Sequence, residues 1–258
     1  RTKSPEQMIA ELEQMTKSGE VQTVLFADDN LIGNKKILKS DLLPALIDWH
    51  KRTNPGLYFM TQLTINLADD DEMMRLMLEA KFRNIFIGIE TPQEDSLKFS
   101  LKNQNLKRDL MTNINKLHEE GFTVLGGFIV GFDTDKEESF KNLIDFIQES
   151  AIPIPIVNVL KAPPGTALFD RMKREQRLSK HFSFSEGDSN IIPVMGEERV
   201  RSGFLEVISN VYPAEHSYKR IKKFLEIHQF PKNGGVKVKE KYTLYQLFHF
   251  VKAVIKLA

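Results

Sequence analysis

The chain has 258 residues, of which 41% are hydrophobic and 28% are charged, so it is long and apolar enough to build a substantial core. The formal net charge is +1, which implies no strongly basic face and argues against nucleic-acid binding. There is no cysteine, which excludes disulfides, cysteine nucleophiles and thiolate-held metal centres within the chain. The six histidines form no HxH or HExxH pair, so we expect no metal site.

Short apolar runs alternate with helix-spaced apolar residues along the first two thirds of the chain. Ser4-Pro5-Glu6 has the capping serine, the proline and the early acid of a helix start. We predict strands at residues 21–27, 57–63, 84–90, 122–130 and 154–160, with amphipathic helices between them. Units of roughly 30–40 residues match parallel βαβ crossovers. The pattern therefore predicts an α/β fold with a helix-covered parallel sheet.

The pattern changes after Leu160. A rigid turn at residues 162–166 leads into a predicted helix near 167–174, and residues 179–196 read as loop. Further helices are predicted at 197–211, 214–229 and 241–257. We place a boundary near residue 178, between an α/β core at residues 1–178 and a helical C-terminal domain at residues 179–258.

Polar or glycine-rich sequence follows each predicted strand. Parallel α/β proteins place ligands at the carboxyl ends of strands, so these segments are candidates for one binding rim. Carboxylates accept hydrogen bonds from ammonium and hydroxyl groups, and glycines let the backbone approach a planar base, which suits a zwitterionic, hydroxylated ligand. Each segment alone also has an ordinary explanation, such as an Asx cap, a solvated strand end or tight packing. The segments are Asp28-Asp29-Asn30, Gln62 to Asn66, Glu90-Thr91-Pro92, Gly126 to Asp133, and Lys161 to Thr166.

In combination, these segments resemble the cobalamin-binding subgroup of radical S-adenosylmethionine (SAM) enzymes, to which hopanoid methylases belong. The matching stretches are VLFADDNLIGNKK, TQLTINLADD, NIFIGIETPQEDSL, GGFIVGFDTD and LKAPPGT. The resemblance is strong over about residues 1–180 and continues at Ser189-Asn190-Ile191-Ile192-Pro193. It implies a partial (β/α)6 TIM-like barrel, in which this chain supplies strands two to six, with a C-terminal helical appendage.

The resemblance also assigns cofactor-binding roles to individual residues, although it assigns no catalytic residue. Asp28, Asp29 and Asn30 would bind the SAM amino group. Three residues on the next two strand ends would reach the ribose or the methionyl moiety: Gln62, Asn66 and Glu90. The adenine would pack against Gly127, Ile129 and Gly131 and receive backbone contacts from Leu160 and Lys161.

One feature of that family is missing from this sequence. The motif CxxxCxxC, whose three thiolates hold a [4Fe–4S] cluster, is absent. We expect it to lie upstream of Arg1, together with the first barrel strand and a cobalamin-binding domain. On that expectation the present chain alone is inactive, and the strand at 21–27 is left as an unpaired barrel edge.

The resemblance implies that the whole enzyme is a cobalamin-dependent methyltransferase acting on an unreactive carbon of a small or lipid-like substrate. Its cofactors would be SAM, the [4Fe–4S] cluster and cobalamin, and an electron-donor protein would be a partner. A non-redox α/β module that binds SAM or another nucleoside is the alternative. We expect a cytoplasmic protein with no nucleic-acid partner. The apolar segment at residues 241–258 is either a helix docked on the core or a peripheral membrane contact.

Overall fold

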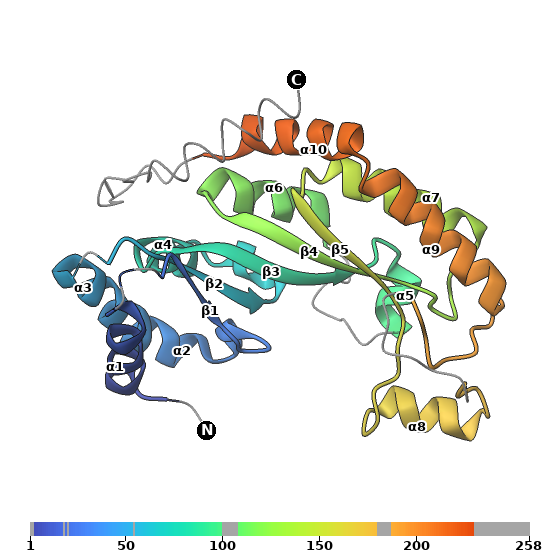
Figure 1. Ribbon diagram of the computed structural model, residues 1–258, viewed down its shortest axis with the longest axis horizontal. Helices are drawn as coiled ribbons and strands as arrows, with labels where there is room; N and C mark the ends of the chain where they lie inside the picture. The colour runs from blue at the N-terminus through green and yellow to red at the C-terminus, as the bar shows by residue number, and fades with distance from the viewer. Residues whose placement is uncertain are drawn as a thin grey trace.

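Five strands form a single parallel sheet in the order of the sequence, β1-β2-β3-β4-β5. The computed structural model describes residues 3–17, 19, 21–53, 55–99, 108–179 and 187–229, with the backbone alone for Lys98 and Phe99. The strands are β1 (Thr23–Phe26), β2 (Tyr58–Leu63), β3 (Phe82–Glu90), β4 (Thr123–Val130) and β5 (Ile154–Val159) (Figure 1).

Helices connect the strands and extend beyond the last one. Between β1 and β2 the chain forms a 3-10 turn, a short helix, a π-helical turn and a longer helix, and a second 3-10 turn follows β2. The helical elements in chain order are α1 (Pro5–Thr16), η1 (Leu31–Asn34), α2 (Lys35–Ile37), η2 (Leu38–Leu42), α3 (Leu43–Thr53), η3 (Ile65–Asp69), α4 (Asp71–Glu79), α5 (Glu94–Phe99), α6 (Leu110–Glu120), α7 (Glu137–Glu149), α8 (Ala167–Arg174), α9 (Glu197–Val211) and α10 (Ala214–Ile227).

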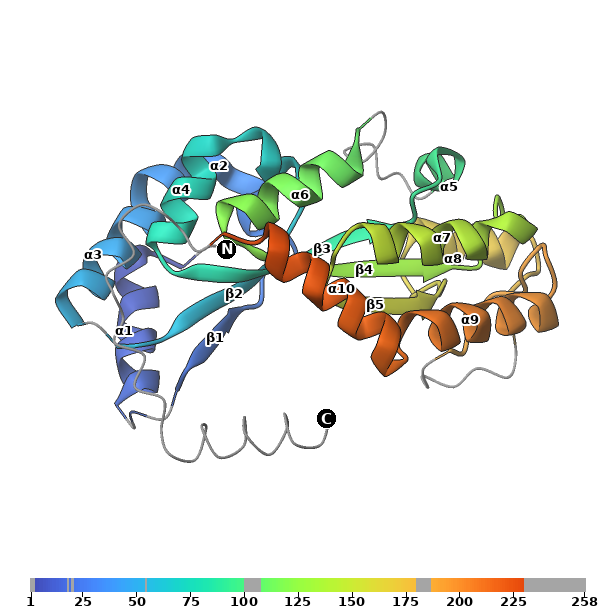
Figure 2. The same ribbon diagram turned by 90° about the horizontal axis from the view of Figure 1, so that it is seen from above.

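The two faces of the sheet have different environments. Phe26, Thr61, Ile85 and Val124 pair in register across four strands, and all are buried because the helices cover that face. Helices α6, α7, α9 and α10 lie along one side of the arched sheet, and the view from above shows α4, α6 and α7 following one another over it (Figures 1 and 2). The opposite face carries a second register row, Gln62, Phe86, Leu125 and Ile154.

The described residues leave this second face largely uncovered. Its side chains Leu25, Ile154 and Ile156 are 58%, 50% and 39% exposed. Large apolar side chains are normally buried, so such a row on one face indicates a surface that other groups contact.

The predicted α/β class and all five predicted strands are confirmed, with β3 beginning two residues earlier than expected, at Phe82. The helices predicted at 167–174 and 197–211 are present as α8 and α9, and α10 ends at Ile227. The helix predicted at 241–257 lies outside the described residues.

Helix α9 packs tightly against α7 and shares the apolar core of the sheet. A Cβ atom on Gly203 would lie 2.3 Å from the Phe140 ring, so only glycine permits this close approach. Val200, Val207 and Val211 belong to the same buried cluster as the strand side chains. The hydrophobic core of the sheet thus continues to the side chains of α9. The domain boundary near residue 178 stays a prediction.

Tyr212, at the end of α9, covers the outer edge of β5. Its hydroxyl donates to the Pro155 carbonyl oxygen at 3.0 Å and accepts from the Val157 N–H at 3.3 Å. These are backbone groups that an incoming strand would otherwise bind. The side chain therefore terminates the sheet at this edge.

We expect Tyr212→Phe to lower the free energy of unfolding by about 1–2 kcal/mol, since two hydrogen bonds of about 1 kcal/mol each are lost. The variant should also aggregate faster, because the β5 edge becomes available for pairing. Chemical denaturation and light scattering measure the two effects. Tyr218→Phe is the matched control, since Tyr218 is 67% exposed; equal behaviour of the two variants would contradict the edge role.

Two histidines are buried in the core without full hydrogen bonding. His118 is 0% exposed and neither ring nitrogen has a partner, while Nε2 of His50 is also unpartnered. Burial lowers the pKa of His118 from 6.5 to about 4, with a further contribution from the charge of His228. Burial also lowers the pKa of His50 to about 4, with contributions from Lys81 and Arg83.

Acid should therefore destabilise the fold. A histidine whose folded-state pKa is depressed stabilises the protein fully above its unfolded pKa of 6.5, and this contribution is lost as the pH falls toward 4. Between pH 7.5 and pH 5 we expect a loss of about 2 kcal/mol from His118, because each pK unit corresponds to about 1.4 kcal/mol. Urea unfolding of His118→Leu should show a pH dependence smaller by that amount. An unchanged slope in His118→Leu would refute the assignment.

Candidate functional site

The carboxyl ends of all five strands lie at one edge of the sheet, because every strand pairs in parallel with the next. The predicted site residues lie in the loops at this edge or in the last four residues of the strands, except Asn66, which lies in η3. The edge can therefore act as the single rim that the sequence predicted. How these residues meet differs from strand to strand.

At β1 and β2 the rim is joined by a hydrogen bond between two loops. Asp28 and Asp29 are exposed directly after β1. The next residue, Asn30, is half-buried, and its Oδ1 accepts from the Thr64 N–H at 3.3 Å. The Thr64 hydroxyl also donates to Oδ1 of Asn66. The Asn30 side chain thus makes a structural hydrogen bond, whereas Asp28 and Asp29 are exposed.

Gln62 lies in β2 itself, on the uncovered face. It is exposed, and its register partner on β3 is Phe86. Its amide is therefore available above the sheet, close to an aromatic ring. This position suits a contact with a ligand that lies on the face.

The end of β3 is irregular. The pairing of β3 with β4 shifts register between Gly88 and Glu90, and Glu90 has φ 69°. A left-handed backbone at a residue with a side chain costs about 1–2 kcal/mol and is found most often at functional sites. The bulge turns the half-buried Glu90 away from the regular alternation of the strand.

The β4 glycines permit close packing on the uncovered face. Gly127 pairs with Gly88 on β3, and a Cβ atom on Gly127 would lie 2.7 Å from the Phe86 ring. Phe86 therefore lies over a flat strip of backbone. Ile129 is half-buried on the same face, two residues further along β4.

A half-buried carboxylate, that of Asp135, holds the turn after β4. Asp135 accepts hydrogen bonds from the N–H groups of Gly131 and Phe132, at 2.8 and 3.1 Å, and from the Ser96 hydroxyl at 3.3 Å. Gly131 has φ 95°, a conformation that glycine adopts without strain. Burial raises the pKa of Asp135 although these hydrogen bonds lower it. The loops after β3 and β4 are thus tied together through α5.

The end of β5 is held by a clamp from the segment before α9. Leu160 N–H donates to the Val130 carbonyl at 2.8 Å, and the Ser189 hydroxyl donates to the Leu160 carbonyl at 2.6 Å. Asn190 pairs with both backbone groups of Ala162, at 2.8 and 2.6 Å. This explains the Ser189-Asn190 pair that the sequence comparison singled out. Lys161, between the two clamped residues, is half-buried.

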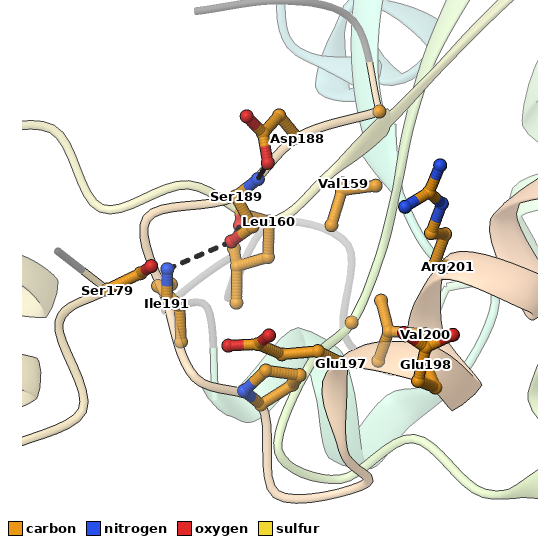
Figure 3. Close-up of a pocket in the computed structure, with 13 residues that line it drawn as sticks. Val159, Leu160, Ser179, Asp188, Ser189, Ile191, Glu197, Glu198, Val200 and Arg201 are labelled. Carbon is orange, nitrogen blue, oxygen red and sulfur yellow. Dashed lines mark hydrogen bonds between the residues drawn. The ribbon is translucent and has the colours of Figure 1, made fainter. Parts of the chain in front are cut away.

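A cavity of about 150 Å³ opens between the ends of β4 and β5 and the start of α9. Of the eleven predicted residues only Gly131 and Leu160 line it, and the other nine lie elsewhere on the rim or the uncovered face. Figure 3 shows Glu197 extending toward Leu160 and Ile191, with Arg201 beside Val159 and Val200. Residues that sequence reasoning did not assign complete the lining, chiefly Ser179, Asp188, Ser189, Glu197, Glu198 and Arg201.

Asp133 is a rim residue with a structural role that the sequence did not reveal. It lies between the guanidinium groups of Arg177, with a shortest separation of 2.5 Å, and Arg171, at 2.5 Å. Burial tends to raise the pKa of Asp133, but the two arginines lower it on balance. The carboxylate therefore fixes α8 and the following segment to the end of β4.

The donor set fits SAM and does not fit an iron–sulfur cluster. The exposed acids, the amide of Gln62 and the glycine strip of β4 can meet an ammonium, hydroxyl groups and a planar base. The sequence contains no cysteine, and within the described ranges no three His, Asp or Glu side chains gather as a metal site. No thiolate of this chain can hold a cluster.

We expect Asp135→Ala to lower the free energy of unfolding by about 2–3 kcal/mol, because three donors lose their acceptor. Asp135→Asn should cost less than about 1 kcal/mol, since the amide oxygen still accepts and a buried charge is removed. Denaturant titrations of both variants measure the difference. Equal losses for Ala and Asn would show that the hydrogen bonds to the Gly131 turn contribute little.

The comparisons with known proteins agree with this geometry. A family model described as the radical SAM superfamily matches residues 1–147, and a domain of unknown function, DUF4070, matches residues 166–258. The hopanoid C-2 methylase of Rhodopseudomonas palustris (strain TIE-1) is 38% identical over 220 residues, which cover 85% of this chain and 41% of that protein. The bacteriochlorophyllide d C-12(1)-methyltransferase of Chlorobaculum tepidum is 27% identical over 200 residues, 76% of this chain and 42% of its own length.

Among solved structures, the radical S-adenosylmethionine methyltransferase TsrM from Kitasatospora setae, with cobalamin and a [4Fe-4S] cluster bound, superposes with a TM-score of 0.60. The match covers 88% of this chain and 47% of that one at 13% identity, so it shows the likeness of the fold. It confirms the predicted TIM-like architecture. The chain spans 41% of the length of the hopanoid C-2 methylase. It also spans 41% of the length of an uncharacterized methyltransferase of Synechocystis, to which it is 36% identical.

Proposed function

The chain belongs to the radical SAM superfamily, and from that premise we propose that it is the SAM-binding part of a cobalamin-dependent methyltransferase. The proposed target is an unreactive carbon of a small or lipid-like substrate. The observation that carries the proposal is the rim itself, where carboxylate, amide and glycine positions from successive parallel strands border an uncovered face. The names of the related methylases support the reaction class.

The chain's own residues would bind and orient SAM. The exposed carboxylates of Asp28 and Asp29 would accept hydrogen bonds from the ammonium group of SAM, with Asn30 beside them. The ribose and methionyl groups would meet Gln62, Asn66 and Glu90. The base would lie against Gly127, Ile129 and Gly131, near the backbones of Leu160 and Lys161.

The redox chemistry would come from outside these residues. In the whole enzyme a [4Fe–4S] cluster would supply the electron for SAM cleavage and cobalamin would serve in methyl transfer. Since the chain has no cysteine, the proposal requires the thiolates to be provided by another part of the protein.

The proposal extends to partners. A protein electron donor would serve the whole enzyme, and a lipid-like substrate would favour peripheral membrane contact by a cytoplasmic enzyme through residues 241–258, which lie outside the described residues. Among the helices that the structure describes, none is long and apolar enough to span a bilayer.

SAM binding tests the site. The double variant Asp28→Asn with Asp29→Asn should raise the dissociation constant for SAM about tenfold, since about 1.4 kcal/mol of charge-assisted hydrogen bonding is lost. Isothermal titration calorimetry measures it. The control Asp48→Asn with Asp145→Asn removes the same charge from exposed positions on α3 and α7. Equal affinities in the two double variants would contradict the proposed ammonium site.

A second measurement separates the enzyme from the alternative, a non-redox SAM or nucleoside-binding module. The whole enzyme, loaded with cluster and cobalamin, should cleave SAM to 5′-deoxyadenosine. Retained SAM binding without cleavage would favour the binding module and contradict the methyltransferase.

A further inference from the structure

A group of basic side chains lies at the end of the sheet opposite to the rim, where the strands begin. Lys81 directly precedes β3, Arg83 is the second residue of that strand, and His50 lies near the end of α3. Lys81 is 5% exposed and His50 is 6% exposed, and Arg83 is half-buried. Within the ranges described, no carboxylate side chain forms an ion pair with any of the three. No carboxylate shifts the pKa of Lys81 or Arg83, although the phenol of Tyr58 raises that of Arg83 against the larger lowering by burial.

The backbone of Lys81 and the ring of His50 both contact Phe59 of β2. The Phe59 N–H donates to the Lys81 carbonyl at 2.9 Å, and the His50 ring packs edge-on against the Phe59 ring, with centroids 5.0 Å apart. Arg83 Nη1 donates to the Leu78 carbonyl at 3.0 Å, which fixes the guanidinium at the end of α4. The Arg83 guanidinium and the His50 ring are therefore held by contacts with well-packed elements, and Lys81 is held by its backbone.

The charges of the group act on one another. Burial lowers the pKa of Lys81, and the charge of Arg83 lowers it further. Burial has the larger effect on His50 as well, followed by the charges of Lys81 and Arg83. The charge of Arg83 thus acts on both Lys81 and His50, so the three groups lie within electrostatic reach and repel when charged.

Buried ring nitrogens without a hydrogen-bond partner accompany the charges. Nε2 of His50 and Nε1 of Trp49 are buried with no partner, and their rings lie 4.9 Å apart. An unpaired buried donor costs about 1–3 kcal/mol, and an unpaired buried charge costs more. Lys81 also has φ 73°, a backbone conformation that glycine would adopt without strain. Lys81 is therefore present although its burial, the nearby charge of Arg83 and its backbone conformation all disfavour a lysine at this position.

We propose that Lys81, Arg83 and His50 form a binding site for a phosphate-type oxyanion at the amino ends of β2 and β3. An ammonium provides a compact charge and a guanidinium provides a planar fork of donors, and together they match a tetrahedral oxyanion. The anion would compensate the repulsion and accept from the unpartnered donors. The site is independent of the proposed SAM rim, because the two lie at opposite ends of the strands.

Inorganic phosphate tests the site directly. The unfolding midpoint is measured against phosphate concentration, with sodium chloride added to keep the ionic strength constant. A ligand that binds the folded state alone raises the midpoint with its concentration, so we expect a rise of about 3 °C or more for the wild-type chain at saturation. Lys81→Met retains the apolar stem and should abolish the rise. In chloride alone this variant should melt no lower than wild type, since a buried charge is removed.

The matched control is Lys51→Met, which removes an exposed lysine one residue from His50. It should retain the phosphate-dependent rise. Non-specific attraction of phosphate to this end of the molecule would instead reduce the response of both variants alike.

A second experiment distinguishes a free anion from a lipid headgroup. Vesicles of phosphatidylcholine, with and without phosphatidic acid, are co-sedimented with the same three proteins. Phosphatidic acid-dependent binding that is lost in Lys81→Met and kept in Lys51→Met assigns the site to a headgroup phosphate, whereas a response to inorganic phosphate alone assigns it to a free anion. No response of the wild type in either experiment, or an undiminished response of Lys81→Met, would overturn the proposal.

Discussion

Parallel pairing in chain order is the constraint on which the other features of this molecule depend. Each strand pairs with the next in sequence, so every crossover returns the chain along the same side and every strand ends at the same edge. One end of the sheet therefore collects acids, amides and glycines, and the other carries the buried Lys81 and the half-buried Arg83. Two different chemical environments follow from a single rule of connectivity.

The fold was predictable because its signals are local, whereas much of the site depends on contacts that are distant in sequence. Apolar runs bounded by polar segments identify all five strands. The bulge before Glu90 has no comparable signal, since it arises from the pairing of two strands. The contacts of Tyr212 with Pro155 and of Asn190 with Ala162 join residues 57 and 28 positions apart. Gly131 and Leu160 were identified from sequence, but their partners in the cavity come from α9 and the segment before it.

Backbone strain brackets the central strand β3. Lys81 precedes it with φ 73° and Glu90 ends it with φ 69°, and both carry side chains that disfavour this conformation. The buried apolar side chains of β3, among them Ile85, Ile87 and Ile89, anchor the strand firmly enough to offset strain at its ends. Strand β3 thus carries one strained residue at each end: Lys81 at the proposed anion site and Glu90 at the proposed SAM rim.

The hydroxyl of Tyr212 makes the two edges of the sheet different, because it occupies backbone groups at the β5 edge only. With the outer edge of β5 occupied by a side chain, the sheet has a stop at one end and, among the described residues, an open template at β1. The helices that follow β5 instead pack on the covered side of the sheet, as α9 does against α7 and β5. A further strand of the same sheet would therefore pair at β1, whose outer edge has no partner strand among the described residues.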